Sequence, residues 1–125
     1  FRNVTGVQTC ALPISSVCRM DNELFCVAYN GGIYKSDYNV FHWSTVQKPN
    51  GVASKRKHYN AVVQYNNHTA VAVGNNGLVT LTHDNFGSTS SAESFNSTNL
   101  HGLLLLSEST GVCVGDNGSI FRFTF

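Results

Sequence analysis

Three segments of the chain align with one another without a gap, and this internal repeat constrains the fold more than any other feature. They read SVCRMDNELFCVAYNGGIY (16–34), AVVQYNNHTAVAVGNNGLV (61–79) and GLLLLSESTGVCVGDNGSI (102–120). The glycines that anchor this alignment, spaced 45 and 41 residues apart, are Gly32, Gly77 and Gly118. Self-similarity at such a period indicates an array of equivalent structural units rather than one irregular domain.

Each unit follows the same order of apolar and polar segments. An apolar strand, a polar turn and a second apolar strand come first, and an Asn/Gly-rich turn then leads into a third strand. Asn-Gly pairs adopt positive φ readily and therefore predict tight hairpin turns at Asn30–Gly31, Asn76–Gly77 and Asn117–Gly118. The middle strand of each unit is apolar at nearly every position, which predicts that both faces of its sheet are covered.

A unit of this length, built from antiparallel strands alone, is typical of one blade of a β-propeller. The sequence therefore predicts an all-β fold, a partial β-propeller of about three blades at residues 15–48, 49–90 and 91–125. A β-sandwich with accidental internal similarity is the alternative. Closed propellers have about 4 to 8 blades, so three blades leave open sheet edges that invite pairing with another chain. We expect a fragment of a larger propeller, and a homo-oligomer formed through these edges is the other interpretation.

Two turn regions resemble a known repeat. VGNNGLVTLTHDNFGST (73–89) and VGDNGSIFRFTF (114–125) are similar to the repeats of the photosystem II assembly and stability factor family, which belong with the bacterial-neuraminidase, or Asp-box, propellers. In that family a VG-x-x-G-x-I turn precedes a strand and a Ser/Thr-x-Asp-x-Gly-x-Thr-Trp turn. Residues 82–89 carry one extra residue before the glycine and lack the Trp, whereas residues 36–43 keep the Ser and Trp but not the Asp and Gly. The resemblance covers the chain from Ser16 to its end.

The resemblance implies structural rather than catalytic roles for the turn residues. An Asp side chain accepts backbone N–H groups within its own turn, and we expect the following Gly to supply positive φ. The residues interpreted as structural in this way are Gly32, Gly77, Gly118, Asn76, Asn117, Asp84 and Gly87. In the family such boxes lie at the blade periphery. If the resemblance extends to function, the partners are protein subunits being assembled.

Charge and apolar content exclude some classes of partner. The net charge is +1 and 12% of the residues are charged, which argues against nucleic-acid binding. The longest apolar run, 103–106, is far too short to span a bilayer. The basic run Lys55, Arg56, Lys57 and His58 lies in the longest polar connection. A solvated loop is its simpler interpretation, yet it is the best candidate in the sequence for a partner-binding loop.

No arrangement of residues in the sequence predicts an enzyme or metal site. The histidines form no i, i+4 pair or Cys/His box, so we expect no metal and no cofactor. Most acidic residues fall in turns of the repeat, and no facing pair of carboxylates is implied. Cys18 and Cys26 flank the first turn symmetrically and could lie opposite each other, although buried thiols are the favoured interpretation. Asn67 and Asn96 are candidate glycosylation sites if the chain is secreted.

The opening stretch VTGVQTCALPI (4–14) matches the in-frame translation of a common sequencing adapter. We therefore expect residues 1–14 to be a foreign lead-in and residues 15–125 to be the propeller fragment. The natural start is then absent, so extracellular, periplasmic and organellar locations all stay open.

The combined prediction is a non-catalytic propeller fragment that acts as a protein-binding or assembly scaffold. The alternatives are a fragment of a secreted Asp-box glycoside hydrolase or carbohydrate-binding propeller, and a self-assembling repeat subunit.

Overall fold

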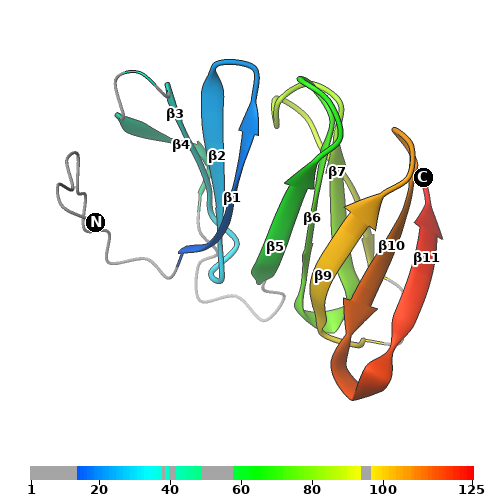
Figure 1. Cartoon of the computed structure of the whole chain (residues 1–125). Helices are drawn as coiled ribbons and strands as arrows, with labels where there is room; N and C mark the ends of the chain where they lie inside the picture. The colour runs from blue at the N-terminus through cyan, green and yellow to red at the C-terminus, as the bar shows by residue number, and fades with distance from the viewer. Residues whose placement is uncertain (1–13, 38, 40–41, 49–57, 94–96) are drawn as a thin grey trace, which may run out of the picture.

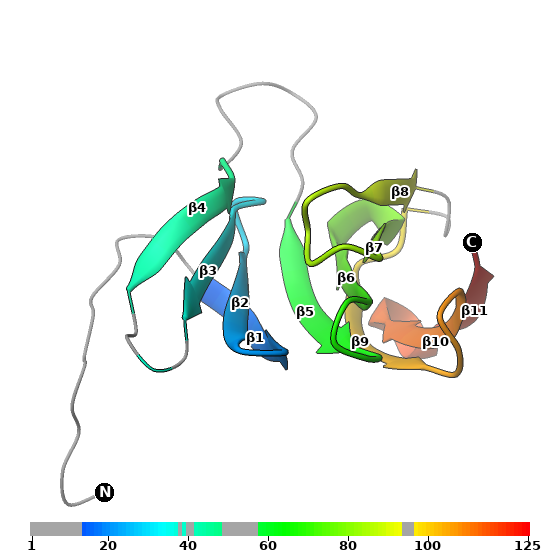
Figure 2. The ribbon, with the colours of Figure 1, turned by 90° about the horizontal axis from the view of Figure 1, so that it is seen from above.

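The chain forms three antiparallel sheets, each a meander in sequence order (Figures 1 and 2). The computed structural model describes residues 14–37, 39, 42–48, 58–93 and 97–125. Blade 1 consists of β1 (Ile14–Met20), β2 (Glu23–Ala28), β3 (Ile33–Asp37) and β4 (Trp43–Gln47). Blade 2 consists of β5 (Tyr59–Gln64), β6 (Ala70–Gly74), the 3₁₀ turn η1 (Asn75–Gly77), β7 (Leu78–Thr82) and β8 (Ser90–Glu93). Blade 3 consists of β9 (Leu100–Leu105), β10 (Thr110–Gly115), the 3₁₀ turn η2 (Asp116–Gly118) and β11 (Ile120–Thr124).

The blades stand side by side, and β5 packs against both β1 and β9 (Figure 2). Two boundaries differ from the sequence prediction. Ile14, assigned above to the lead-in, begins β1 and pairs with Ala28. Strand β8 extends to Glu93 and so keeps residues 91–93 in blade 2. No helix in the described part of the chain is long and apolar enough to cross a membrane.

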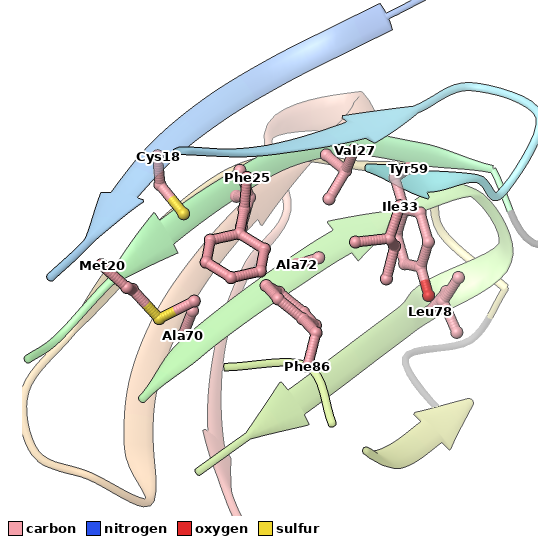
Figure 3. Close-up of a cluster of buried hydrophobic side chains, with 11 residues drawn as sticks. Cys18, Met20, Phe25, Val27, Ile33, Tyr59, Ala70, Ala72, Leu78 and Phe86 are labelled. Carbon is pink, nitrogen blue, oxygen red and sulfur yellow. The ribbon is translucent and has the colours of Figure 1, made fainter. Parts of the chain in front are cut away.

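Two apolar cores lie between the blades, one in each seam. The first contains Phe25, Val27 and Ile33 of blade 1, packed against blade 2 (Figure 3). The second packs Val71 and other residues of blade 2 against blade 3. Strands β6 and β7 are buried at every position because blade 2 is covered on both faces. For β6, the middle strand of blade 2, this confirms the expectation drawn from its continuous apolar character. The middle strand of blade 3, β10, differs, because Val114 is exposed.

The tight turns of blades 2 and 3 share one backbone conformation. Asn76 (φ 58°) and Gly77 (φ 71°) occupy the two central positions of the blade 2 turn. The equivalent pair in blade 3, Asn117 (φ 59°) and Gly118 (φ 70°), does the same. Two successive positive φ values define a type I′ turn, for which Asn-Gly is the preferred sequence.

The turn of blade 1 differs, and the positive φ falls on Gly31 (φ 85°) rather than on Gly32. The cause is the first hairpin, in which Met20 pairs with Glu23 across a two-residue turn. That turn is one residue shorter than the gapless alignment requires. From β2 onward, each blade 1 residue therefore matches the repeat position one place later than in the gapless alignment, and Gly31 is the equivalent of Gly77 rather than of Asn76.

The same shift separates the two cysteines of blade 1. Cys18 pairs with Phe25, and Cys26 pairs with Val17. Adjacent pairs point to opposite faces of a sheet, so Cys18 and Cys26 do not lie opposite each other, and the favoured interpretation as buried thiols is confirmed. Both are buried free thiols. Burial, with a smaller contribution from Cys26, raises the pKa of Cys18 to about 12, and burial raises that of Cys26 to about 11.

Candidate functional site

The predicted partner-binding loop is described only at its last residue. Lys55, Arg56 and Lys57 lie outside the described residues, as does Asn96. The His58 Nδ1 lies 2.5 Å from the carbonyl oxygen of Tyr29, and the two rings are 4.5 Å apart between centroids. These contacts join blade 1 to blade 2, so the described contacts of the His58 ring are made within the chain.

The turn between β7 and β8 is organised by Asp84. Its Oδ1 accepts a hydrogen bond from the Ser88 backbone N–H (2.8 Å), and its Oδ2 accepts one from the Ser88 hydroxyl (2.7 Å). The Thr82 hydroxyl lies 2.9 Å from Oδ1 and accepts the backbone N–H of Phe86 at 2.8 Å. The Ser88 side chain above all, then its backbone and Thr82, hold the pKa of Asp84 below its ordinary value. The carboxylate is thus engaged within its own turn.

This turn also places an aromatic side chain in the seam between blades 1 and 2. Asn85 (φ 58°) and Phe86 (φ 63°) carry the positive φ values, whereas Gly87, expected to do so, has none. The Phe86 ring is 4% exposed and packs 5.5 Å from the ring of Phe25 (Figure 3). Phe86 is the extra residue of the loose Asp box, so the insertion supplies a core side chain.

A polar hollow opens where the β1–β2 turn meets the β5–β6 turn. We call it the turn hollow; its volume is about 440 Å³, and its lining residues are Arg19, Asp21, Asn22, Gln64, Tyr65, Asn66 and Asn67. The Asp21 backbone N–H donates to Asn67 Oδ1 at 3.3 Å, and Arg19 Nε donates to the Asp21 carbonyl at 2.9 Å. The first bond joins blade 1 to blade 2 across the hollow, and the second holds the Arg19 side chain against its own turn.

The rim formed by the turns continues onto blade 3. Asn66 Nδ2 donates to Glu108 Oε1 at 3.1 Å, and Asn66 Oδ1 also accepts the backbone N–H groups of His68 and Thr69. The Asn67 carbonyl accepts from Asn85 Nδ2 at 2.9 Å. Turns from all three blades are therefore held laterally by asparagine side chains at one end of the molecule.

The sequence contained a signal for this site that was not used. The turns at 21–23 and 66–68 occupy equivalent positions in successive repeats, and equivalent turns of adjacent blades lie at the same end of a propeller. Repeat equivalence alone would have placed Asp21 beside Asn67, although 46 residues separate them.

The described acidic and metal-ligating residues form no cluster. Within the described ranges, no three His, Cys, Asp or Glu side chains gather where they could hold a metal ion. Glu23 lies 3.5 Å from Lys35, and Asp116 lies 2.6 Å from His101. Together with Asp84, these carboxylates are engaged by near neighbours, and the turn hollow offers hydrogen-bonding groups suited to binding.

Comparisons with known proteins identify the fold. No family model and no curated protein matches the sequence. Fifteen chains of solved structures match the fold. One of them, described as "YCF48 bound to D1 peptide", superposes with a TM-score of 0.68 at 16% sequence identity, over 90% of this chain and 37% of that one. This chain thus spans little more than a third of that neighbour. The prediction of an all-β, partial β-propeller fold is confirmed.

Proposed function

We propose that this chain is a non-catalytic part of a β-propeller that serves as a protein-binding or assembly scaffold, and that the turn hollow is its peptide-contacting surface. The observation that carries the proposal is the hollow itself, a polar depression fixed between two blades. The fold supports it, because a propeller of similar structure is described with a bound peptide. That similarity concerns the fold, and the site on this chain is argued from its own residues.

The chemistry of the hollow suits an extended polypeptide. Its lining combines amide groups that both donate and accept with one cation, Arg19, and one half-exposed aromatic ring, Tyr65. A peptide backbone presents N–H and C=O groups in alternation and needs partners of both kinds. Tyr and Arg side chains are also enriched among residues that dominate binding energy at protein interfaces. We also propose the loop residues Lys55, Arg56 and Lys57 as a contact for an acidic segment of a protein partner.

The non-catalytic and Asp-box assignments belong to the same proposal. The hydrogen bonds of Asp84 within its own turn support a structural role for the loose box at 82–89.

Glycosylation of Asn67 would place a sugar in the hollow, so a glycan there and a bound peptide would exclude each other.

Selection from a displayed random-peptide library, with the D1 peptide as an additional probe, tests the proposal. Peptides selected on the wild-type chain should bind the Tyr65→Ala and Asn22→Ala variants about tenfold or more weakly. Thr89→Ala, an exposed change in the β7–β8 turn, is the matched control and should bind like wild type. Selected peptides that bind all variants equally would contradict the assignment of the hollow. Turnover of fluorogenic glycosides by the chain would contradict a non-catalytic role.

A further inference from the structure

The outer face of blade 3 exposes an apolar pair of residues that is buried at the matching position of each earlier blade. The cross-strand pair beside each tight turn shows this, and these pairs are Val27–Ile33, Val73–Val79 and Val114–Ile120. The pairs of blades 1 and 2 are fully buried, at 0% exposure, in the seams that join successive blades. In the third pair, Ile120 is 72% exposed and Val114 is exposed as well.

The exposed face continues along β9. Leu104, which pairs with Val112, is 64% exposed, and Leu106 beyond it is also exposed. The equivalent positions in blade 1 are Cys18 and Met20, which are buried against blade 2. An apolar surface of this extent on a single chain marks an interaction site.

A charged residue at the edge of this face also has a counterpart in a formed seam. Arg122 pairs with Val112 on β10, as Lys35 pairs with Phe25 on β2. Lys35 is exposed beside the first seam, 3.5 Å from Glu23. A cation at this position is therefore compatible with a packed junction, at its rim.

Blade 1 carries the complementary face. Val17, paired with Cys26, is 57% exposed, and Ile14 is exposed. The positions equivalent to Val17 and Ile14 in blade 2 are Val62 and Tyr59, both buried in the first seam. The chain thus exposes both halves of the junction that it builds twice within itself.

We propose that blade 3 of one chain docks onto blade 1 of a second copy, and that two copies close a six-bladed ring. The contact is head-to-tail, and such contacts form rings when the rotation closes. Six blades fall within the usual range of about 4 to 8. Each new junction brings together the same strand positions that pack in the two internal seams. The inference rests on interblade packing and stands whether or not the turn hollow binds a peptide.

Light scattering coupled to size exclusion, over a series of protein concentrations, tests this assembly. Wild type should run at twice the mass of one 13.6 kDa chain. Ile120→Lys and Leu104→Lys should raise the dissociation constant about a hundredfold, because a charge would be buried without a partner. Both residues are exposed in one chain, so the circular dichroism spectrum should not change. Thr89→Lys, in the β7–β8 turn of the middle blade, is the matched control and should dimerise like wild type.

Mixing experiments distinguish a head-to-tail contact from a face-to-face one. Val17→Lys should be monomeric alone, as should Ile120→Lys, because every junction of each homodimer contains a lysine. An equimolar mixture should recover dimers that are weaker than wild type. One of its two junctions, blade 3 of the Val17→Lys chain on blade 1 of the Ile120→Lys chain, contains no lysine, whereas the other junction contains both. A wild-type chain that stays monomeric, larger assemblies in place of dimers, or a Val17→Lys variant that dimerises alone would each overturn the proposal.

Discussion

Phe86 offers a direct test of how the β7–β8 turn and the blade 1–2 seam depend on each other. Its side chain is 4% exposed, yet its backbone has φ 63°, in a region that side chains other than glycine rarely occupy. Replacing a buried Phe with Ala costs about 3–5 kcal/mol, because the burial is lost and a cavity remains. Phe86→Ala should therefore destabilise the chain by about that amount.

Phe86→Gly should destabilise the chain less than Phe86→Ala, in reverse of the usual order. Both variants lose the same ring, but glycine alone removes a left-handed strain of about 1–2 kcal/mol. Glycine also gives the unfolded chain more freedom, which costs about 0.4–1 kcal/mol. The net advantage of Phe86→Gly over Phe86→Ala is therefore about 0.5–1 kcal/mol.

Urea unfolding followed by the fluorescence of Trp43, the single tryptophan, measures these differences. Circular dichroism should give the same midpoints if unfolding is two-state. Thr89 is the matched control, since it lies in the same turn without positive φ, and Thr89→Gly should be less stable than Thr89→Ala. If glycine is the less stable replacement at both positions by a similar margin, the strain assigned to Phe86 does not exist.

Three further predictions concern the turns and the cores. The pKa of Asp84 is lowered in the folded chain. Its contribution to stability is therefore present above the ordinary pKa of 3.8 and is lost as pH falls through the folded value. Asp84→Asn should weaken the loss of stability at acid pH, and an unchanged pH dependence would count against the turn contacts. A Cβ at Gly74 would collide with the backbone carbonyl of His58, so Gly74→Ala should lower the urea midpoint by more than any surface Gly→Ala change. Burial and raised pKa values should protect the thiols of Cys18 and Cys26 from alkylation at mildly alkaline pH until the chain unfolds. Site-resolved mass spectrometry measures the labelling of each thiol, and rapid labelling of the folded chain would refute this prediction.

The repeat made the architecture predictable but not its fine register. Strand order and the burial of β6 followed from the periodic apolar segments, because each blade can bury its faces only against neighbours. The one-residue difference at the Asp21–Asn22 turn was not predictable from the alignment, since the glycine pair Gly31–Gly32 fits either register. With a side-chain period of two, that single residue reverses which face each side chain occupies. It therefore decided whether Cys26 could lie beside Cys18.

The site was harder to predict than the fold because its parts carry no distinctive motif. Asn66 and Asn67 are ordinary turn residues in the sequence, and their lateral bonds to Glu108 and Asp21 appear only when the blades are side by side. In the sequence, the loose box at 82–89 shows only one extra residue before its glycine, and nothing there predicts that Phe86 is buried. Its burial depends on the opposite blade, where Phe25 provides the surface that the ring covers.

The residues on the outer face of blade 3 are typical of a junction between two blades, and they differ from those of an end cap. Repeat proteins that end in solution carry polar residues on the outer face of the terminal unit, because that face meets water. Blade 3 instead keeps Val114 and Ile120 at the positions where blade 2 uses Val73 and Val79. Polar substitution at Ile120 would cost the single chain little buried surface, since the side chain is mostly exposed. An apolar residue there is explained by a surface that packs onto it, and blade 1, with Val17 exposed, supplies such a surface.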